Sequence, residues 1–205
     1  ANNPELYKKA IRDFNKALKY KPQFPQAYHN RGLCYDNLGM YPKALEDFNK
    51  AISQDIDDYK IYVNRGVVKG KTGKLNEALQ DFRKALKMAP RQPDALSNMG
   101  LAYSHLKEYD KALKYYKQAI EADPSFTNAY YNRGLLHAQQ NRTGKAMADF
   151  TQTIRLDKKN AAAYYQRALL YRKQQKENKA CKDLMRAANL GHQAANRLFA
   201  KTCKN

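Results

Sequence analysis

The chain has 205 residues and a formal net charge of +19; 43% of the residues are hydrophobic, and there are only 9 glycines and 7 prolines. This composition provides apolar material for a core and excludes a disordered or fibrous chain. No apolar run approaches the roughly 18 residues of a membrane-spanning helix, and no signal-peptide pattern is present. We therefore expect a folded, soluble protein without a membrane span.

The positive charge is concentrated toward the C-terminus. Residues 1–58 carry 9 Lys and Arg against 8 Asp and Glu, residues 59–126 carry 13 against 7, and residues 127–205 carry 16 against 4. The excess of +12 in the last segment would raise encounter rates with acidic proteins, nucleic acid or anionic lipid, but it specifies none of them. The charge alone therefore leaves the class of partner open.

One sequence pattern returns at a fixed interval along the chain. The tripeptide Asn-Arg-Gly occurs at residues 30–32, 64–66 and 132–134, so the second interval is twice the first. At the glycine position of this period every unit has a small residue: Gly32, Gly66, Gly100, Gly134 and Ala168. A constant period over this length indicates repeated copies of one structural unit.

The first element that the sequence predicts is a helix within residues 1–24. Ala10, Phe14 and Ala17 are spaced by four and three residues, which places them on one helical face, and Pro22 cannot continue a helix. The same small–bulky–small pattern returns in every later unit, as in Ala44, Phe48 and Ala51. Small residues let two helices approach closely while the aromatic ring fills the space between them.

Five complete units follow, at residues 25–58, 59–92, 93–126, 127–160 and 161–191. Each is predicted to form two helices, because its middle is a polar or glycine-containing stretch such as "NLGMYP" or "KTGKLN" that suits a short turn. Residues 192–205 predict one last helix, with Ala195, Leu198, Phe199 and Thr202 on one face. Such a helix would cover the apolar end of the last unit as a cap.

These recurring positions resemble the tetratricopeptide repeat, a 34-residue helical hairpin. The resemblance covers nearly the whole chain and implies an all-α protein, an α-solenoid in which antiparallel helix pairs stack as a right-handed superhelix with a C-terminal capping helix. Residues 1–24 match only the second helix of a repeat, so we expect the chain to begin within one. The family's leucine before the glycine is replaced by arginine in most units.

These arginines are predicted to form structural ion pairs. Each precedes an aspartate by 16 residues, in the pairs Arg31–Asp47, Arg65–Asp81, Arg133–Asp149 and Arg167–Asp183. In the repeat at 93–126 the two positions hold Met99 and Tyr115, so both charges disappear together. Pairing each arginine with the preceding repeat's aspartate would place Asp81 opposite Met99, which favours pairs within a repeat.

Side-chain amides recur on the first helix of each repeat, where stacked repeats expose a common face: Asn30, Asn64, Asn98, Asn132 and Gln166. Related tetratricopeptide proteins use such amides to bind the backbone of an extended peptide, and the resemblance implies the same role here. The alternative is that the amides cap turns or bridge repeats. Tyr131 and Tyr165 would add contact surface, and Arg172 and Lys173 would favour an acidic segment.

No catalytic or metal-binding pattern is present. The "GKT" at residues 70–72 lacks the upstream glycine of a phosphate loop, because position 65 is Arg65, and the four histidines have no zinc-site spacing. We therefore expect no enzyme, cofactor or metal. The sequence favours a non-catalytic scaffold that binds a peptide or protein segment. The alternative function is binding of nucleic acid or another polyanion by the basic C-terminal half. The oligomeric state is not specified.

The three cysteines fall into two groups. Cys34 and Cys181 occupy positions at which the other repeats have mostly aliphatic residues, so both are expected in the core. Cys181 and Cys203 lie on opposite sides of Gly191 at nearly equal separations in sequence, so on antiparallel helices they reach similar heights. They can form a disulfide, which would indicate an oxidising, extracytoplasmic compartment; free thiols, the alternative, would be compatible with the cytoplasm.

Overall fold

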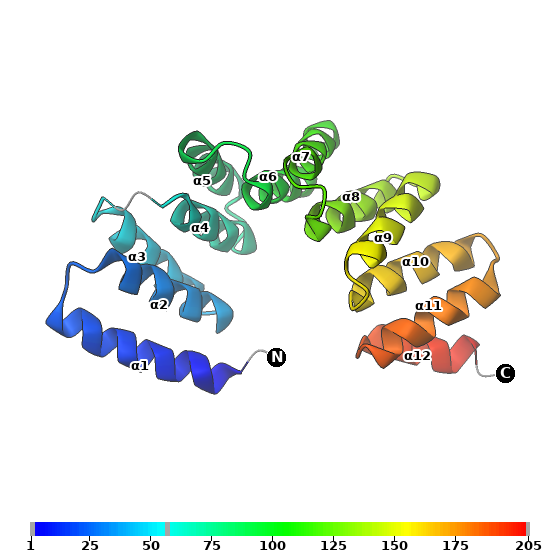
Figure 1. Ribbon diagram of the computed structural model, residues 1–205, viewed down its shortest axis with the longest axis horizontal. Helices are drawn as coiled ribbons and strands as arrows, with labels where there is room; N and C mark the ends of the chain where they lie inside the picture. The colour runs from blue at the N-terminus through cyan, green and yellow to red at the C-terminus, as the bar shows by residue number, and fades with distance from the viewer. Residues whose placement is uncertain (1–2, 56–57, 204–205) are drawn as a thin grey trace. The chain divides into compact units, whose positions relative to one another are not determined.

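The protein is all-α. The computed structural model describes residues 3–55 and 58–203, and these form twelve helices and no strand (Figure 1). The helices are α1 (Pro4–Tyr20), α2 (Pro25–Asn37), α3 (Tyr41–Ile52), α4 (Tyr59–Lys71), α5 (Leu75–Met88), α6 (Pro93–His105), α7 (Tyr109–Ala122), α8 (Thr127–Gln139), α9 (Thr143–Leu156), α10 (Ala161–Lys173), α11 (Glu177–Asn189) and α12 (Gln193–Thr202). Each predicted complete repeat contains two helices. The predicted boundaries at residues 1 and 205, and residues 56–57, lie outside the described residues.

The chain divides into two compact units, Ala1–Leu106 and Lys107–Asn205, called unit 1 and unit 2 below. In unit 1, α2 packs on α3 and α4 on α5, and the first helices α2, α4 and α6 contact one another in sequence. In unit 2, α8 packs on α9, α10 on α11, and α12 on α11. Each unit thus contains two helix pairs that pack on one another, as the sequence predicts. Among the described residues no helix is long and apolar enough to cross a membrane.

A glycine packed against an aromatic ring brings the two helices of a hairpin together. A Cβ atom added at Gly32, Gly66 or Gly134 would lie 2.7, 2.6 or 2.9 Å from a ring carbon of the facing phenylalanine. Side chains in folded proteins do not approach that closely, so only glycine permits this separation. The facing rings are almost completely buried and fill the interface between the helices: Phe48, Phe82 and Phe150.

Two glycines one turn apart on α4 should respond oppositely to alanine. We expect Gly66→Ala to lower the free energy of unfolding by about 1–3 kcal/mol, because the new methyl group must displace the buried Phe82 ring. At Gly70 an added Cβ meets nothing within 4 Å. Gly70→Ala should therefore raise the free energy of unfolding by up to about 1 kcal/mol through helix propensity. Urea unfolding measures both changes; changes of the same sign would contradict the close packing of Gly66.

The turn inside each hairpin uses a left-handed backbone at one periodic position. The φ angle is 72° at Gly39, 80° at Gly73, 62° at Lys107, 57° at Asn141 and 59° at Gln175. Glycine adopts this conformation freely, whereas a residue with a side chain is destabilised there by about 1–2 kcal/mol. Because the angle persists without glycine at Asn141 and Gln175, both within unit 2, the packing of those two hairpins imposes the turn on the residue that occupies it.

The structure brings together the four arginine–aspartate pairs within their repeats. Arg65 donates from Nε and Nη2 to the two carboxylate oxygens of Asp81, at 2.9 and 2.6 Å, and the other three pairs have the same geometry with distances of 2.6–2.9 Å. The four aspartates are buried. Bidentate pairing fixes the orientation of both side chains, so each pair sets how its first helix lies on its second helix.

Three of these arginines also reach the second helix of the preceding repeat. The Nη1 atom donates to Asn15 from Arg31 and to Asn49 from Arg65, at 2.6 and 2.7 Å. In unit 2, Arg167 donates in the same way to Thr151 Oγ1 at 3.2 Å. Each acceptor lies 16 residues before its arginine, and the paired aspartate lies 16 residues after it. Sequence reasoning missed the first of these two contacts. The guanidinium group therefore links neighbouring repeats as well as the helices of one repeat.

The C-terminal helix is attached covalently. Cys181 on α11 and Cys203 at the end of α12 form a disulfide with a Cα–Cα distance of 5.7 Å. Leu198 and Phe199 of α12 pack on a buried apolar cluster of α10 and α11, as the capping pattern predicts. The remaining cysteine, Cys34, is a buried free thiol, and burial raises its pKa.

Candidate functional site

The predicted amides lie on the first helices of their hairpins. Asn30 on α2, Asn64 on α4 and Asn98 on α6 belong to unit 1, and Asn132 on α8 and Gln166 on α10 belong to unit 2. Asn30 is exposed and the other four are half-buried. Within the described part of the chain, four of the side-chain amides have no hydrogen-bond partner: Asn30, Asn98, Asn132 and Gln166. A recurring polar group without a structural partner is available to a ligand.

Asn64 is the exception. Its Nδ2 lies 2.9 Å from Nε2 of His29, a buried residue on α2. Burial lowers the pKa of His29, so the ring is neutral at neutral pH and Nε2 can accept a hydrogen bond from the amide. Asn64 thus bridges two repeats, the alternative role that the sequence left open for these amides, and His29 is a partner that sequence reasoning missed.

The four further residues predicted for ligand contact have partners inside unit 2. Tyr131 packs on the Phe150 ring at a centroid distance of 5.9 Å, and Tyr165 stacks on His192 at 4.4 Å. Arg172 Nε lies 3.6 Å from a carboxylate oxygen of Glu177, and Lys173 donates to Asn141 Oδ1 at 2.9 Å. Ring packing thus holds Tyr131 and Tyr165, and a hydrogen bond holds Lys173, whereas the buried Nε atom of Arg172 has no hydrogen-bond partner among the described residues.

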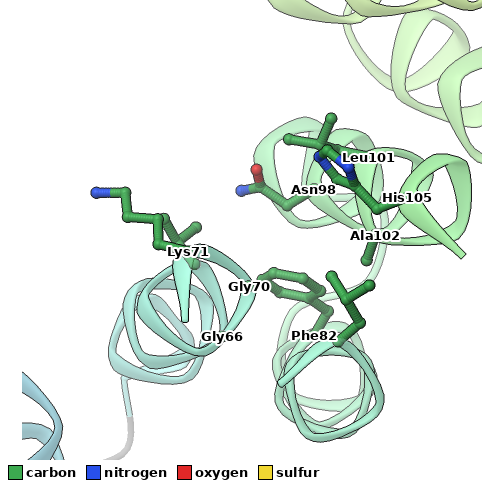
Figure 2. A pocket seen from close by; sticks show the side chains of 10 residues that line it. Gly66, Gly70, Lys71, Phe82, Asn98, Leu101, Ala102 and His105 are labelled. Carbon is green, nitrogen blue, oxygen red and sulfur yellow. The ribbon is translucent and has the colours of Figure 1, made fainter. Parts of the chain in front are cut away.

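A cavity of about 190 Å³ lies between α4 and α6 in unit 1 (Figure 2). Most of its lining is apolar: Gly66, Val67, Gly70, Leu75, Phe82, Leu101 and Ala102. Three polar side chains complete it: Lys71, Asn98 and His105. In Figure 2 the Phe82 ring projects between the two helices, and the side chains of Asn98, Leu101 and His105 extend from α6. The cavity thus adjoins one of the amides that has no partner.

The cationic group at this cavity is already neutralised. Lys71 Nζ donates to both carboxylate oxygens of Asp36 on α2, at 2.7 and 2.9 Å, and lies 5.8 Å from the centre of the Tyr41 ring. In Figure 2 its amino group points away from Asn98. The polar character of the opening therefore comes from the Asn98 amide and the His105 ring.

This face offers amide donors and acceptors beside an apolar cavity, and such groups can pair with a polypeptide backbone and contact an apolar side chain. Among the described residues no group of three or more His, Cys, Asp and Glu side chains could hold a metal ion.

Several solved structures are similar to this chain. A chain in the crystal structure of the APC/C hetero-tetramer Cut9–Hcn1 has a TM-score of 0.84 and 16% identity, over 98% of this chain and 40% of that one. TTC0263, a TPR protein of Thermus thermophilus, gives 0.75 and 22%, over 87% and 98%. YrrB, described as a TPR protein with an unusual peptide-binding site, gives 0.59 and 24%, over 92% and 97%. At these identities the likeness shows the fold.

Family models identify the repeats directly in the sequence. Tetratricopeptide repeat models match residues 25–58 and 93–126, 115–148 and 161–190, and a TPR repeat model matches residues 6–39 and 71–107. No match was found among curated protein sequences. Because the matched segments together span most of the chain and its helices form the corresponding hairpins, the protein belongs to the tetratricopeptide repeat family.

Proposed function

We propose that this protein is a non-catalytic scaffold that binds an extended segment of another protein along its first helices. One observation carries the proposal. Along the first helices the arginine at one position is bound to an aspartate in four repeats. In three of those repeats the amide immediately before it has no hydrogen-bond partner among the residues that the structure describes: Asn30, Asn132 and Gln166. The recurring arginines therefore stabilise the fold, whereas the recurring amides are available to bind a ligand.

An extended peptide matches this column chemically. A carboxamide donates two hydrogen bonds and accepts others, so one asparagine can pair with both the N–H and the C=O of a peptide backbone. Successive first helices of unit 1 contact one another and carry Asn30, Asn64 and Asn98 in order. The peptide-binding site described for YrrB supports the same use of the fold. The excess of basic residues in unit 2 would favour a segment with acidic residues.

The double variant Asn30→Ala/Asn98→Ala tests the proposal. Two lost hydrogen bonds to a peptide are worth about 2 kcal/mol, so the dissociation constant for a partner isolated from the native host should rise by about 30-fold. Asn76→Ala is the matched control, because Asn76 is an exposed asparagine on the second helix α5. Equal affinities of the double variant, the control and the parent protein would refute binding through the amides.

We also infer that the protein functions in an oxidising compartment. The Cys181–Cys203 disulfide supports this, since structural disulfides persist outside the reducing cytosol. Thiol trapping in the native host should find this pair oxidised; three reduced thiols would contradict the inference.

A further inference from the structure

The cavity between α4 and α6 adjoins two positions at which the repeat at 59–92 has smaller residues than the repeat before it. Gly70 occupies the position that holds Asp36 in the preceding repeat. Leu75 likewise occupies the position of Tyr41, and the tyrosine returns in the following repeat as Tyr109. At both positions this repeat therefore has less side-chain volume than the repeat before it.

The corresponding place one repeat earlier holds an ion pair beside an aromatic ring. Between α2 and α4, the Lys71 side chain bonds Asp36 and lies over the Tyr41 ring. Between α4 and α6, the equivalents of these three residues are His105, Gly70 and Leu75. No ion pair can form with a glycine, and the leucine leaves the space that a phenol ring would occupy. The opening of about 190 Å³ adjoins both of these positions.

The size and lining of the cavity select its occupant. An apolar cavity of about 150 Å³ accommodates benzene, whereas pockets for drug-sized ligands measure about 300–1,000 Å³. A cavity of 190 Å³ therefore fits one side chain better than a whole small molecule. A charged group would be desolvated there without an opposite charge, because Lys71 is already bound to Asp36.

We propose that this cavity binds one aliphatic or aromatic side chain of an extended protein segment, whose backbone pairs with Asn98. The inference rests on the proposed function and adds a chemical requirement to it, an apolar anchor residue. Leu101 is 38% exposed and extends the apolar surface on α6. Because burial removes the apolar side chain from water, the anchor residue should strengthen binding at least tenfold.

Filling the cavity tests the inference. A peptide library selected on the immobilised full chain should yield sequences that share one apolar residue, and replacing that residue with serine should weaken binding at least tenfold. Gly70→Leu should weaken binding to the same extent, because an added side chain at Gly70 meets open space and can enter the cavity. Gly144→Leu is the matched control, since a Cβ at this helical glycine on α9 also meets nothing within 4 Å.

Two further measurements keep the test decisive. Leu75→Tyr fills the same cavity from α5 and replaces Gly70→Leu if that variant does not fold. Benzene titrated into the parent protein should shift the methyl NMR signals of Val67 and Leu101, and either cavity-filling variant should abolish the shift. An absence of shifts in the parent protein would overturn the inference.

The outcomes also separate the anchor from the proposed function. If selected peptides depend on Asn30 and Asn98 but bind Gly70→Leu with unchanged affinity, the anchor inference is wrong and the proposed function stands. If no peptide is selected at all, both are contradicted.

Discussion

We expect Asp81→Ala to lower the free energy of unfolding by about 3–5 kcal/mol, because it leaves two cationic groups without their shared anion. Asp81 is 4% exposed and accepts hydrogen bonds from Nε and Nη2 of Arg65. The Nζ atom of Lys69 lies 2.9 Å from Oδ2 of Asp81. The Arg65 and Lys69 side chains are 17% and 15% exposed, so water can replace the lost carboxylate only in part. Urea unfolding monitored by circular dichroism measures the loss.

An exposed ion pair in unit 1 provides the control. Lys50 and Glu46 lie 2.7 Å apart on α3 with side chains 47% and 62% exposed. Glu46→Ala should therefore change the free energy of unfolding by less than about 1 kcal/mol. A double-mutant cycle of Arg65→Met and Asp81→Ala isolates the pair itself. A coupling energy near zero in that cycle would show that the pair does not hold α4 on α5.

Reduction of the Cys181–Cys203 disulfide should lower the free energy of unfolding of unit 2 by about 3 kcal/mol, because cross-linking a loop of this length removes about that much conformational freedom from the unfolded chain. The two cysteines are separated by 22 positions in sequence. Because α12 packs its apolar face on α10 and α11, we expect the reduced protein to keep the helix docked but to lose it first on heating. Unfolding with and without reductant measures the difference.

Counting thiols provides the independent check. The denatured protein should show one reactive thiol without reductant, from Cys34, and three with it. The variant Cys181→Ala/Cys203→Ala should unfold identically in both conditions. Three thiols in the untreated protein, or a reductant effect that persists in the double variant, would contradict the disulfide.

The hairpins and their ion pairs could be predicted from the sequence because both are periodic. The spacing of residues such as Phe48 and Ala51 indicates one helical face, and the return of that spacing at a constant interval indicates a repeated helical hairpin. The joint replacement of charge by Met99 and Tyr115 indicated that each arginine meets the aspartate of its own repeat. A contact that recurs in every repeat can be recognised by comparing the repeats of one sequence with one another.

The cavity could not be predicted in this way, since it depends on missing side-chain volume in one copy. Gly70 and Leu75 differ from the residues at the same positions of the preceding repeat. Such a difference alone does not show whether other side chains fill the space or leave a cavity. The different roles of two equivalent amides have the same origin. The residue 35 positions before Asn64 is His29, which can accept a hydrogen bond, whereas the residue 35 before Asn98 is Val63, whose side chain cannot. The residue in the preceding repeat therefore determines whether each amide has a hydrogen-bond partner within the fold.

A crystal structure of the full chain with a selected peptide bound tests most directly whether the first helices of unit 1 form the binding face. We predict peptide backbone within hydrogen-bond distance of the Asn98 amide and one apolar side chain of the peptide between Gly70 and Leu101. A peptide bound to the outer surfaces of the second helices α3 and α5, with the cavity empty, would contradict this assignment.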